Sequence, residues 1–394
     1  MSILILGGDG YLGWPTAMYF SDRGYDVVVV DNYFRRKACD ELDTGLLYPV
    51  PNLIDRAKLW HQLTGKEIKV IIGDLTNDEF TRSLFNSKSN YDWALSNNSH
   101  AQPTTVVHYA EQPSAPYSMM NYKYAGLTIT NNLQATNNLM WAVKDLSPET
   151  HIIKLGTMGE YGTPNIDIEE GWLVVTHKGR EQKFLYPRQG GSVYHTTKIM
   201  DTDLLWFGVR NWDLRVTDLM QGPVYGNETE ESKIDPRLKT LFNYDEIFGT
   251  ILNRFIVQAA IDYPLSVYGK GGQKRGFLNI KDTLQCVHKA ELKPADKGEL
   301  RIFNQITETF SVNELATKTQ KAGAALGIKV NIEHIENPRK ELEDHYYNPT
   351  YQGLVDIGVV PHLLSDEYMI HALEEAISCK DNIRRDVIFK GIKW

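Results

Sequence analysis

Short apolar runs alternate with longer amphipathic stretches through the first half of the chain. Each run is rich in β-branched residues and is bounded by Gly, Asp or Pro, which is typical of a buried strand. The predicted strands are Ser2–Leu6, Val27–Val30, Lys69–Ile72, Thr105–Tyr109, His151–Leu155 and Leu214–Thr217. The predicted helices between them are Gly13–Arg23, Asn121–Lys144 and Ser192–Val209. Continuous apolar strands that alternate with helices predict an α/β fold with a doubly wound parallel Rossmann sheet.

Two long segments interrupt this alternation, at about residues 32–67 and 161–191. We expect both to be loops at the carboxyl ends of strands, where functional residues gather. After about Gly222 the pattern becomes irregular, which predicts a smaller C-terminal α/β lobe for the substrate. The predicted domains are therefore 1–222, with the two insertions, and 223–394. A return of the chain to the first domain near 278–300 is left open.

Composition narrows the classes of protein. The 394 residues carry 42 Lys and Arg against 50 Asp and Glu, a net charge of −8, which argues against a general binder of nucleic acid or anionic membranes. No apolar run approaches the roughly 20 residues of a membrane-spanning helix. Cys39, Cys286 and Cys379 are scattered, which argues against a disulfide scaffold or a zinc site. With no leader pattern, we expect a cytoplasmic protein without a metal site.

A glycine-rich turn follows the first predicted strand. Gly8, Gly10 and Gly13 fit the spacing GxGxxG, and Gly7, Gly10 and Gly13 fit GxxGxxG. In either register the glycines allow a tight turn and a close approach of backbone N–H groups to a pyrophosphate at the start of the helix. The position between a strand and a helix predicts a dinucleotide site.

Asp31 ends the second strand at nearly the spacing expected of a ribose-binding acid. A carboxylate there accepts hydrogen bonds from the 2′-hydroxyl and repels a 2′-phosphate, which favours NAD over NADP. Arg35 and Arg36 leave NADP open, because arginine accommodates that phosphate. Asp74 fits an acid near the adenine or an ordinary strand-end turn. The predicted cofactor contacts are Gly7, Asp9, Gly10, Tyr11, Leu12, Gly13, Asp31, Asn32, Arg35, Arg36, Asp74, Leu75 and Lys198.

Tyr194 and Lys198 form a Tyr-x-x-x-Lys pattern on a predicted helix. Residues four apart share one helix face, so the ammonium group of Lys198 is expected to lower the pKa of the Tyr194 phenol. An ordinary tyrosine, with a pKa near 10, is a poor base at neutral pH. Thr157, at the end of the fifth strand, offers a hydroxyl beside the same reacting oxygen.

These motifs resemble those of the extended short-chain dehydrogenase/reductase superfamily. The resemblance rests on the glycine turn, Asp31, Val107–Ala110, Thr157 and the Tyr194/Lys198 pair. It implies that Tyr194 is the acid and base, that Lys198 binds the nicotinamide ribose, and that Thr157 shares the hydroxyl of a nucleotide sugar. Asn132 fits either the helix asparagine of the superfamily or a solvated polar residue.

Longer stretches resemble the UDP-sulfoquinovose synthase family over nearly the whole chain. The stretches are Gly7–Gly13, Asp31–Arg36, Glu111–Ser118, Thr157–Gly171, Val267–Gly276, Phe303–Gln305, Asn337–Arg339 and His345–Asn348. The resemblance implies formation of a C–S bond between UDP-glucose and sulfite, with transient reduction of NAD, by a homodimer that formal naming places among the hydrolases.

The same resemblance assigns further residues. Arg275 and Arg339 match the clamps of the diphosphate and ribose, and Gln221 and Gln273 are weaker polar contacts. His195 and Glu160 are candidate acids or bases for the sugar, although a structural histidine and an ordinary turn carboxylate fit as well. Residues 253–255 fit either a sugar contact or the apolar stripe of a helix.

Two departures from related patterns bear on the reaction. Pro113 stands where the family often has an arginine near the substrate. Met158 and Gly159 stand where sister 4,6-dehydratases usually carry an adjacent Asp-Glu pair, and neither residue can move a proton. A UDP-sugar 4-epimerase, and less readily a 4,6-dehydratase, remain alternatives. A non-enzymatic NAD-binding sensor or scaffold is the remaining one.

Overall fold

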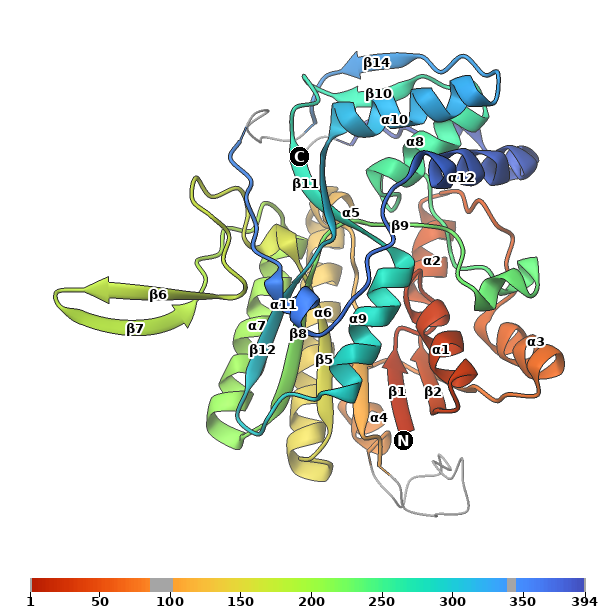
Figure 1. Ribbon diagram of the computed structural model, residues 1–394. Helices are drawn as coiled ribbons and strands as arrows, with labels where there is room; N and C mark the ends of the chain where they lie inside the picture. The colour runs from red at the N-terminus through yellow and green to blue at the C-terminus, as the bar shows by residue number, and fades with distance from the viewer. Residues whose placement is uncertain (1, 86–101, 339–344, 393–394) are drawn as a thin grey trace.

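The computed structural model describes residues 2–85, 102–338 and 345–392. At its centre lies a seven-stranded sheet in the order β12-β8-β5-β4-β1-β2-β3, with every pair parallel (Figure 1). The strands are β1 (Ser2–Leu6), β2 (Asp26–Asp31), β3 (Lys69–Ile72), β4 (Thr105–His108), β5 (His151–Thr157), β8 (Arg215–Gln221) and β12 (Leu300–Gln305). The first six correspond to the predicted strands, so the predicted doubly wound parallel sheet is confirmed.

Helices cover both faces of this sheet, which explains why its strands are apolar at successive positions. One face packs on α4 (Asp78–Ser83), α6 (Tyr122–Leu146) and α7 (Val193–Trp212) through residues such as Leu4 and Leu6. The opposite face packs on α1 (Gly13–Asp22), α3 (Leu53–Thr64) and α9 (Ile280–Leu292) through Ile3 and Ile5. Successive strand side chains point to opposite faces, so each run must be apolar throughout.

The sequence predicts a loop over residues 32–67. In the structure this segment contains two helices. The first, α2 (Phe34–Glu41), is short and polar, and only Ala38 and Cys39 are buried in it. The second, α3, begins at Leu53 and is capped by Asn52, whose side chain accepts a hydrogen bond from the backbone of Asp55. Gly65 ends α3 with a positive φ of 71°, a conformation that glycine adopts without strain. Because α2 is short and buries few residues, its sequence shows little of the hydrophobic periodicity that predicts a helix.

The second predicted loop, residues 161–191, also has regular structure. It contains an antiparallel hairpin of β6 (Trp172–His177) and β7 (Arg180–Leu185), which extends away from the body of the molecule (Figure 1). The turn between the strands places Lys178 and Gly179 at positive φ, the conformation that suits a tight two-residue hairpin.

A second body of structure stands beyond the carboxyl ends of the central strands. Its own core includes Phe255, Val267 and Leu315. Its elements are α8 (Ile251–Ala260), β10 (Leu265–Tyr268), α10 (Val312–Ala325), β14 (Ile332–Ile335) and α12 (Asp366–Ser378), with the small sheet β13 (Glu308–Ser311), β11 (Lys274–Asn279) and β9 (Val224–Tyr225). Through α9 and β12 the chain returns to the central sheet. The boundary at residue 222 stays a prediction.

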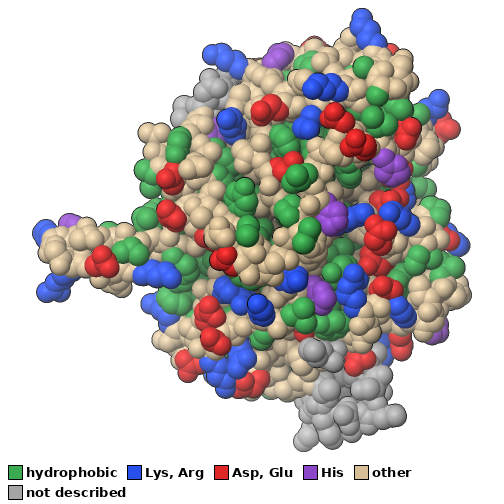
Figure 2. All heavy atoms as spheres, viewed as in Figure 1, with side chains coloured by type: hydrophobic (Ala, Val, Ile, Leu, Met, Phe, Trp, Pro, Cys, Tyr) green, Lys and Arg blue, Asp and Glu red, His purple; other side chains and the backbone are tan. Residues whose placement is uncertain are grey.

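Short elements complete the fold. They are α5 (Ala115–Met119), α11 (Gln352–Asp356) and the 3₁₀ turns at Met158–Glu160, Glu231–Lys233, Pro236–Leu238, Lys380–Asn382 and Arg385–Val387. On the face in Figure 2, basic and acidic side chains are interspersed rather than segregated. Within the described ranges, no helix has the length and apolar character needed to cross a membrane.

Candidate active site

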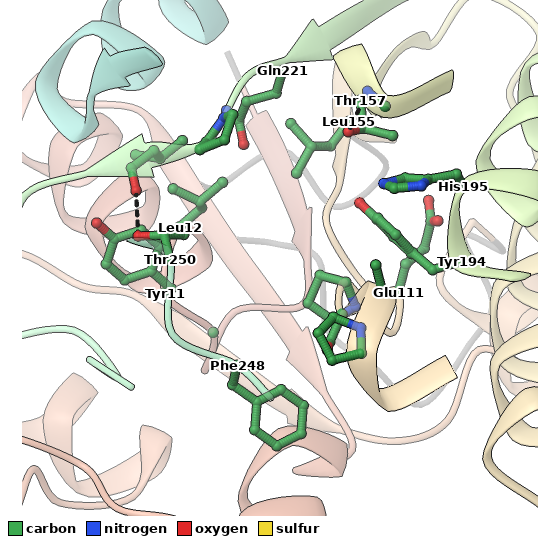
Figure 3. Close-up of a pocket in the computed structure, with 18 of the residues that line it drawn as sticks. Tyr11, Leu12, Glu111, Leu155, Thr157, Tyr194, His195, Gln221, Phe248 and Thr250 are labelled. Atoms are coloured by element: carbon green, nitrogen blue, oxygen red, sulfur yellow. Dashed lines mark hydrogen bonds between the residues drawn. The ribbon is translucent and has the colours of Figure 1, made fainter. Parts of the chain in front are cut away.

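A cavity of about 930 Å³ lies at the carboxyl ends of the central strands, between the sheet and the second body. This is where open α/β sheets bind their ligands. We call the glycine turn of residues 7–13, together with Asp31, the turn end. The wall made by Thr157, Tyr194 and His195 is the reaction end. Figure 3 shows Tyr11 and Leu12 on one side of the cavity and the three reaction-end residues on the other.

The glycine turn is packed so closely that side chains would not fit. A Cβ atom on Gly13 would lie 1.9 Å from the carbonyl oxygen of Gly7, and one on Gly8 would lie 2.5 Å from Cβ of Val29. The residue that precedes α1 is Leu12, which has no group to cap the first N–H groups of the helix. The turn thus packs α1 closely on the strand, and no side chain caps the N-terminus of α1. This arrangement suits the binding of a dinucleotide pyrophosphate.

Asp31 lies on the cavity wall, as predicted. Its carboxylate accepts hydrogen bonds from the backbone N–H groups of Asp9 (2.9 Å) and Tyr33 (2.7 Å). Burial raises the pKa of Asp31 to about 6, and the nearby charge of Asp9 acts in the same direction. The carboxyl group is therefore fixed in place and titrates close to physiological pH.

Asp9 and Arg36 are placed differently from the prediction. Neither lines the cavity; Asp9 Oδ2 pairs with Arg36 Nε and its Oδ1 with Arg56 Nη2, each at 2.7 Å. Arg56, on α3, is fully buried and also donates to the backbone oxygen of Asp9. Direct cofactor contact by the side chains of Asp9 and Arg36 does not fit this arrangement, because the ion pairs hold them beneath the turn.

The other predicted contacts near Asp31 line the cavity. Asn32 Nδ2 donates to Asp74 Oδ2 at 3.0 Å, which joins the ends of β2 and β3. Arg35 donates to Asn243 Oδ1 at 3.2 Å, and its guanidinium carbon lies 4.2 Å from the ring centre of Phe248. The lining residues here are Asn32, Arg35, Asp74 and Leu75, with Tyr11 and Leu12 from the turn.

The first turn of α7 presents Tyr194 and His195 to the cavity. Ser192 caps the helix by accepting from the backbone of His195, and the backbone N–H of Tyr194 donates to Ser118 Oγ at 3.0 Å. The hydroxyl of Thr157 lies near the Tyr194 phenol and acts to lower the pKa of that phenol. Burial raises the pKa of this phenol above its usual value, and the charges of Glu111 and Glu160 add to the effect.

Lys198 does not lower the pKa of Tyr194 in the way its spacing predicts. Its ammonium group donates to Glu111 Oε2 at 2.7 Å, and both side chains are almost completely buried. Burial alone would lower the pKa of Lys198, but the carboxyl groups of Glu111 and Asp201 outweigh it and raise that pKa. The positive charge is matched locally by Glu111, so the net effect of the surroundings on the phenol is upward.

Glu160 lies behind the reaction end rather than in it. Its Oε1 accepts from the backbone N–H of Thr157 at 3.2 Å and lies 3.3 Å from the ammonium group of Lys154. The side chain is fully buried and does not line the cavity. An acid or base role at the sugar does not fit this placement, because Glu160 caps the 3₁₀ turn that follows Thr157.

His195 packs directly over Gly159. A Cβ atom on Gly159 would lie 2.4 Å from His195 Nε2, so the absence of a side chain at 159 makes room for the imidazole. The ring centres of His195 and Tyr194 are 5.2 Å apart. Gly159 is the second of the two positions, Met158 and Gly159, at which the sequence comparison expects the Asp-Glu pair of a 4,6-dehydratase, and the imidazole of His195 lies directly over it.

The second body supplies polar side chains to the opposite wall. Gln273 and Arg275 line the cavity, and Arg275 Nη1 donates to the backbone oxygen of Lys274 at 2.8 Å. Gln221, which also lines it, comes from the end of β8 in the central sheet. Arg254 also lines it and donates to the hydroxyl of Tyr268 at 3.2 Å. The predicted clamp Arg339 lies outside the described residues.

Asn132 is neither in the cavity nor solvated. It is fully buried in α6, where its side chain links the backbone of Gln112 to the hydroxyl of Thr197. Three functional positions had no clear sequence signal. Arg56, Glu111 and Asp201 are buried partners of predicted residues, and only their place in the fold reveals them.

Comparison with known proteins agrees with this geometry. Residues 3–304 match the model of the NAD dependent epimerase/dehydratase family, and the chain belongs to that family. The expected NAD dependence is thereby confirmed at the level of the family.

Within the family, two relatives are similar along the full chain. The chloroplastic UDP-sulfoquinovose synthase of Spinacia oleracea is 46% identical over 392 residues, which cover all of this chain and 79% of the relative. The UDP-sulfoquinovose synthase of Sulfolobus acidocaldarius is 39% identical over 397 residues, which cover all of this chain and 98% of the relative. The family resemblance predicted from the sequence is confirmed.

Solved structures agree on the fold. The UDP-glucose 4-epimerase of Bifidobacterium longum, in complex with NAD⁺ and UDP, has a TM-score of 0.69 at 18% identity and covers 97% of this chain and 99% of its own. The UDP-glucuronic acid 4-epimerase of Bacillus cereus has a TM-score of 0.68 at 18% identity and covers 98% and 100%.

Proposed function

We propose that the protein is a UDP-sulfoquinovose synthase that joins UDP-glucose and sulfite with NAD as a recycled cofactor. One observation carries the proposal beyond the family. Thr157, Tyr194 and His195 converge at one end of the cavity, and His195 occupies the space above Gly159. A hydroxyl, a phenol and an imidazole suit removal and return of protons on a sugar, without the carboxylate pair that a dehydratase uses.

The residues present fit NAD. The uncapped start of α1 and the turn of residues 7–13 would hold its pyrophosphate, and Asp31 would accept from an adenosine ribose hydroxyl. Asp74 and Leu75 would face the adenine. Lys198 does not line the cavity and its ammonium group is held by Glu111, so its contact with the nicotinamide ribose stays a prediction from the family resemblance. When bound, NAD supplies the acceptor, and later the donor, of the hydride at C4 of the sugar.

The chain's own groups would move the protons. Tyr194, in its ionised form, would accept the proton of the 4-hydroxyl, with Thr157 holding that oxygen, and would later return it. The 4-ketone acidifies the C5 proton. When a base takes that proton and the 6-hydroxyl is protonated, water leaves C6 and a C5–C6 double bond forms. His195 faces this part of the cavity and is the proposed acid for that hydroxyl. Addition of sulfite at C6 and return of a proton to C5 then complete the exchange of hydroxyl for sulfonate.

The nucleotide would lie against the second body. Arg254 and Arg275 would meet the diphosphate, since guanidinium groups bind phosphate in two-point contacts. Gln221 and Gln273 are proposed as weaker polar contacts, and the role of Arg339 stays a prediction. Exposed apolar side chains on α6 and α7, including Trp141, Met200 and Phe207, support the proposed homodimer. The cytoplasmic location and the formal hydrolase class stay predictions.

The test is to incubate the purified protein with UDP-glucose, with and without sulfite, and to measure the masses of the sugar nucleotides. We expect a sulfite-dependent gain that equals the replacement of a hydroxyl by a sulfonate. Conversion to UDP-galactose at unchanged mass would instead establish the 4-epimerase. If neither product forms although NAD is bound, the synthase proposal fails with UDP-glucose, and a sensor or scaffold becomes the better interpretation.

A further inference from the structure

A cluster of charged side chains is buried directly behind the reaction end. We call it the reaction-end cluster. Its carboxyl groups are those of Glu111, Glu160, Asp201 and Asp218, and its cations are those of Lys154, Arg188 and Lys198. Four carboxylates against three cations would leave one negative charge unmatched. Because an unmatched charge out of contact with water is costly, the cluster must bind a proton.

Two of the carboxyl groups are well supplied with donors. Asp218 Oδ2 accepts from Thr202 Oγ1 at 2.6 Å and lies 3.4 Å from the Lys154 ammonium. Glu160 accepts from the backbone of Thr157 and lies close to Lys154 and Arg188. Burial still raises the pKa of Glu160, and Asp218 Oδ1 accepts no hydrogen bond from the described residues, but in each group at least one oxygen is held by donors.

The other two carboxyl groups differ. Glu111 Oε2 receives the Lys198 ammonium at 2.7 Å, but its Oε1 receives no donor from the described residues. Asp201 is fully buried, and neither of its oxygens accepts a hydrogen bond from an N–H or O–H group of the described residues. Asp201 stands three residues after Lys198, on the same face of α7, and its side chain lies within hydrogen-bonding reach of Glu111.

We propose that Asp201 is protonated and donates its hydrogen bond to Glu111, so that the two carboxyl groups share one proton and fix Glu111 against Lys198. This arrangement satisfies the unpaired oxygens of both residues with one bond. It also leaves three negative charges facing three cations. Asp201 and Glu111 are thus positioning residues, which act on the reaction only through Lys198 and Tyr194.

The electrostatic surroundings agree with this division of roles. Burial raises the pKa of Asp201 well above its usual value, and the charge of Glu111 adds to the rise. For Glu111 burial would also raise the pKa, but the charge of Lys198, which also donates a hydrogen bond to it, outweighs burial and lowers that pKa. His108 lies 3.7 Å from Glu111, and burial lowers its pKa to about 4, so it is neutral at physiological pH. Two neighbouring carboxyl groups with opposite shifts behave as an acid and its base.

The pair has a consequence for the proposed reaction, and this part rests on the proposed function. A fixed Glu111 holds the Lys198 ammonium in one position and keeps a negative charge close to Tyr194. The proposed cycle returns to the sugar every proton that Tyr194 takes. A cluster that holds its proton within the protein therefore keeps the charge beside Tyr194 constant through the cycle.

Infrared difference spectroscopy tests the shared proton without any substrate. We compare the wild-type protein with Asp201→Asn at about pH 8, where Asp31, with its pKa of about 6, is ionised. The variant is expected to lose the C=O band of a protonated carboxylic acid. The matched control is Asp203→Asn, on the same helix but 61% exposed, which is expected to lose a carboxylate band instead. Loss of a carboxylate band in Asp201→Asn would overturn the proposal.

Two further measurements separate positioning from simple structural support. The amide that Asp201→Asn introduces can donate to Glu111 as the acid does, so this variant should keep the wild-type pH profile for the transient reduction of NAD by UDP-glucose. Asp201→Leu removes that donor and should shift the profile. A shift in Asp201→Asn of about one pH unit toward acid, the effect of a lost negative charge, would contradict the proposal. If these variants do not fold, ¹³C-aspartate labelling of the wild-type protein must move an acid C=O band; no movement sinks the idea.

Discussion

Charge is buried at both ends of the cavity, but the two ends balance it differently. At the turn end, one carboxylate, Asp9, lies between the guanidinium groups of Arg36 and Arg56, at 2.7 Å from each. At the reaction end, carboxyl groups outnumber the cations that face them, and the ammonium groups of Lys154 and Lys198 lie among them.

The difference follows from what each end does. Guanidinium groups do not lose their proton at any physiological pH, and their planar geometry fixes a carboxylate in two directions. Asp9 is thereby held rigidly, and its backbone N–H supports Asp31 at 2.9 Å. Carboxyl groups and a phenol in a cluster, by contrast, can exchange protons. The turn end holds its backbone in place, and in the proposed function the reaction end holds and moves a proton.

The largest effect is expected from a substitution that disables the reaction end alone. Tyr194→Phe removes the phenol that would move the 4-hydroxyl proton, so kcat should fall by about 10²–10⁴-fold while NAD and UDP-glucose still bind. The rate of sulfite-dependent product formation measures the loss, and cofactor titration measures retained binding. Tyr122→Phe, at a residue that is 92% exposed, is the control and should keep full activity. Unchanged turnover in Tyr194→Phe would remove the proposed chemistry.

The next largest effect is expected from a substitution that disrupts the turn end. Arg56→Met leaves Asp9 buried with one cation in place of two, so the free energy of unfolding should fall by about 3–5 kcal/mol. Urea denaturation measures it. The matched control is Lys58→Met on the same helix, whose side chain is 70% exposed and should change stability by less than about 0.5 kcal/mol. Equal effects in the two variants would mean that the buried ion pair contributes no more to the free energy of unfolding than an exposed lysine does.

The sequence predicts the parts of each end that depend on local spacing. The six strands follow from apolar runs, and the glycine turn follows from four glycines between a strand and a helix. The Tyr194/Lys198 face likewise follows from a spacing of four residues on α7. Each of these features depends on residues that are close together in the chain, so it can be predicted from the sequence alone.

The partners that balance the charges could not be predicted in this way. Glu111 follows β4 and meets Lys198 on α7, 87 positions further along the chain. Arg56 sits on α3, in a segment whose weak periodicity predicts a loop. Glu160 is only three residues after Thr157, yet the 3₁₀ turn between them points one side chain into the cavity and the other behind it. Pairing across the sheet and side-chain direction at a strand end are tertiary properties.

A smaller effect tests whether the turn end must keep its backbone geometry to bind NAD. Gly13→Ala would bring a methyl group to 1.9 Å from the Gly7 oxygen, which forces the turn open. Overpacking of this kind costs about 1–3 kcal/mol, so NAD affinity should fall by about 10- to 100-fold. Gly126→Ala is the control, since no atom lies within 4 Å of the added carbon. A fluorescence titration with NAD measures the affinity of both variants. Equal affinities would mean that the geometry of the turn is not needed for cofactor binding.

The smallest effect is a pH dependence that belongs to the turn end alone. Burial, with the charge of Asp9, raises the pKa of Asp31 from 3.8 to about 6. A ribose hydroxyl donates to the ionised carboxylate, so NAD affinity should be full above about pH 7. It should fall about tenfold for each unit by which the pH drops below 6.

The stability of the NAD-free protein should have the opposite sign. Because the folded state holds the Asp31 proton more tightly than the unfolded chain does, the contribution of Asp31 is fully present below pH 3.8 and is lost as the pH rises through about 6. Asp31→Asn should flatten both trends in this window, whereas Asp26→Asn, at the other end of the same strand, should flatten neither. Thermal unfolding with and without NAD from pH 5 to 8 measures the two signs together. If both trends persist in Asp31→Asn, another group titrates in this window, and the assignment of the pH dependence to Asp31 is wrong.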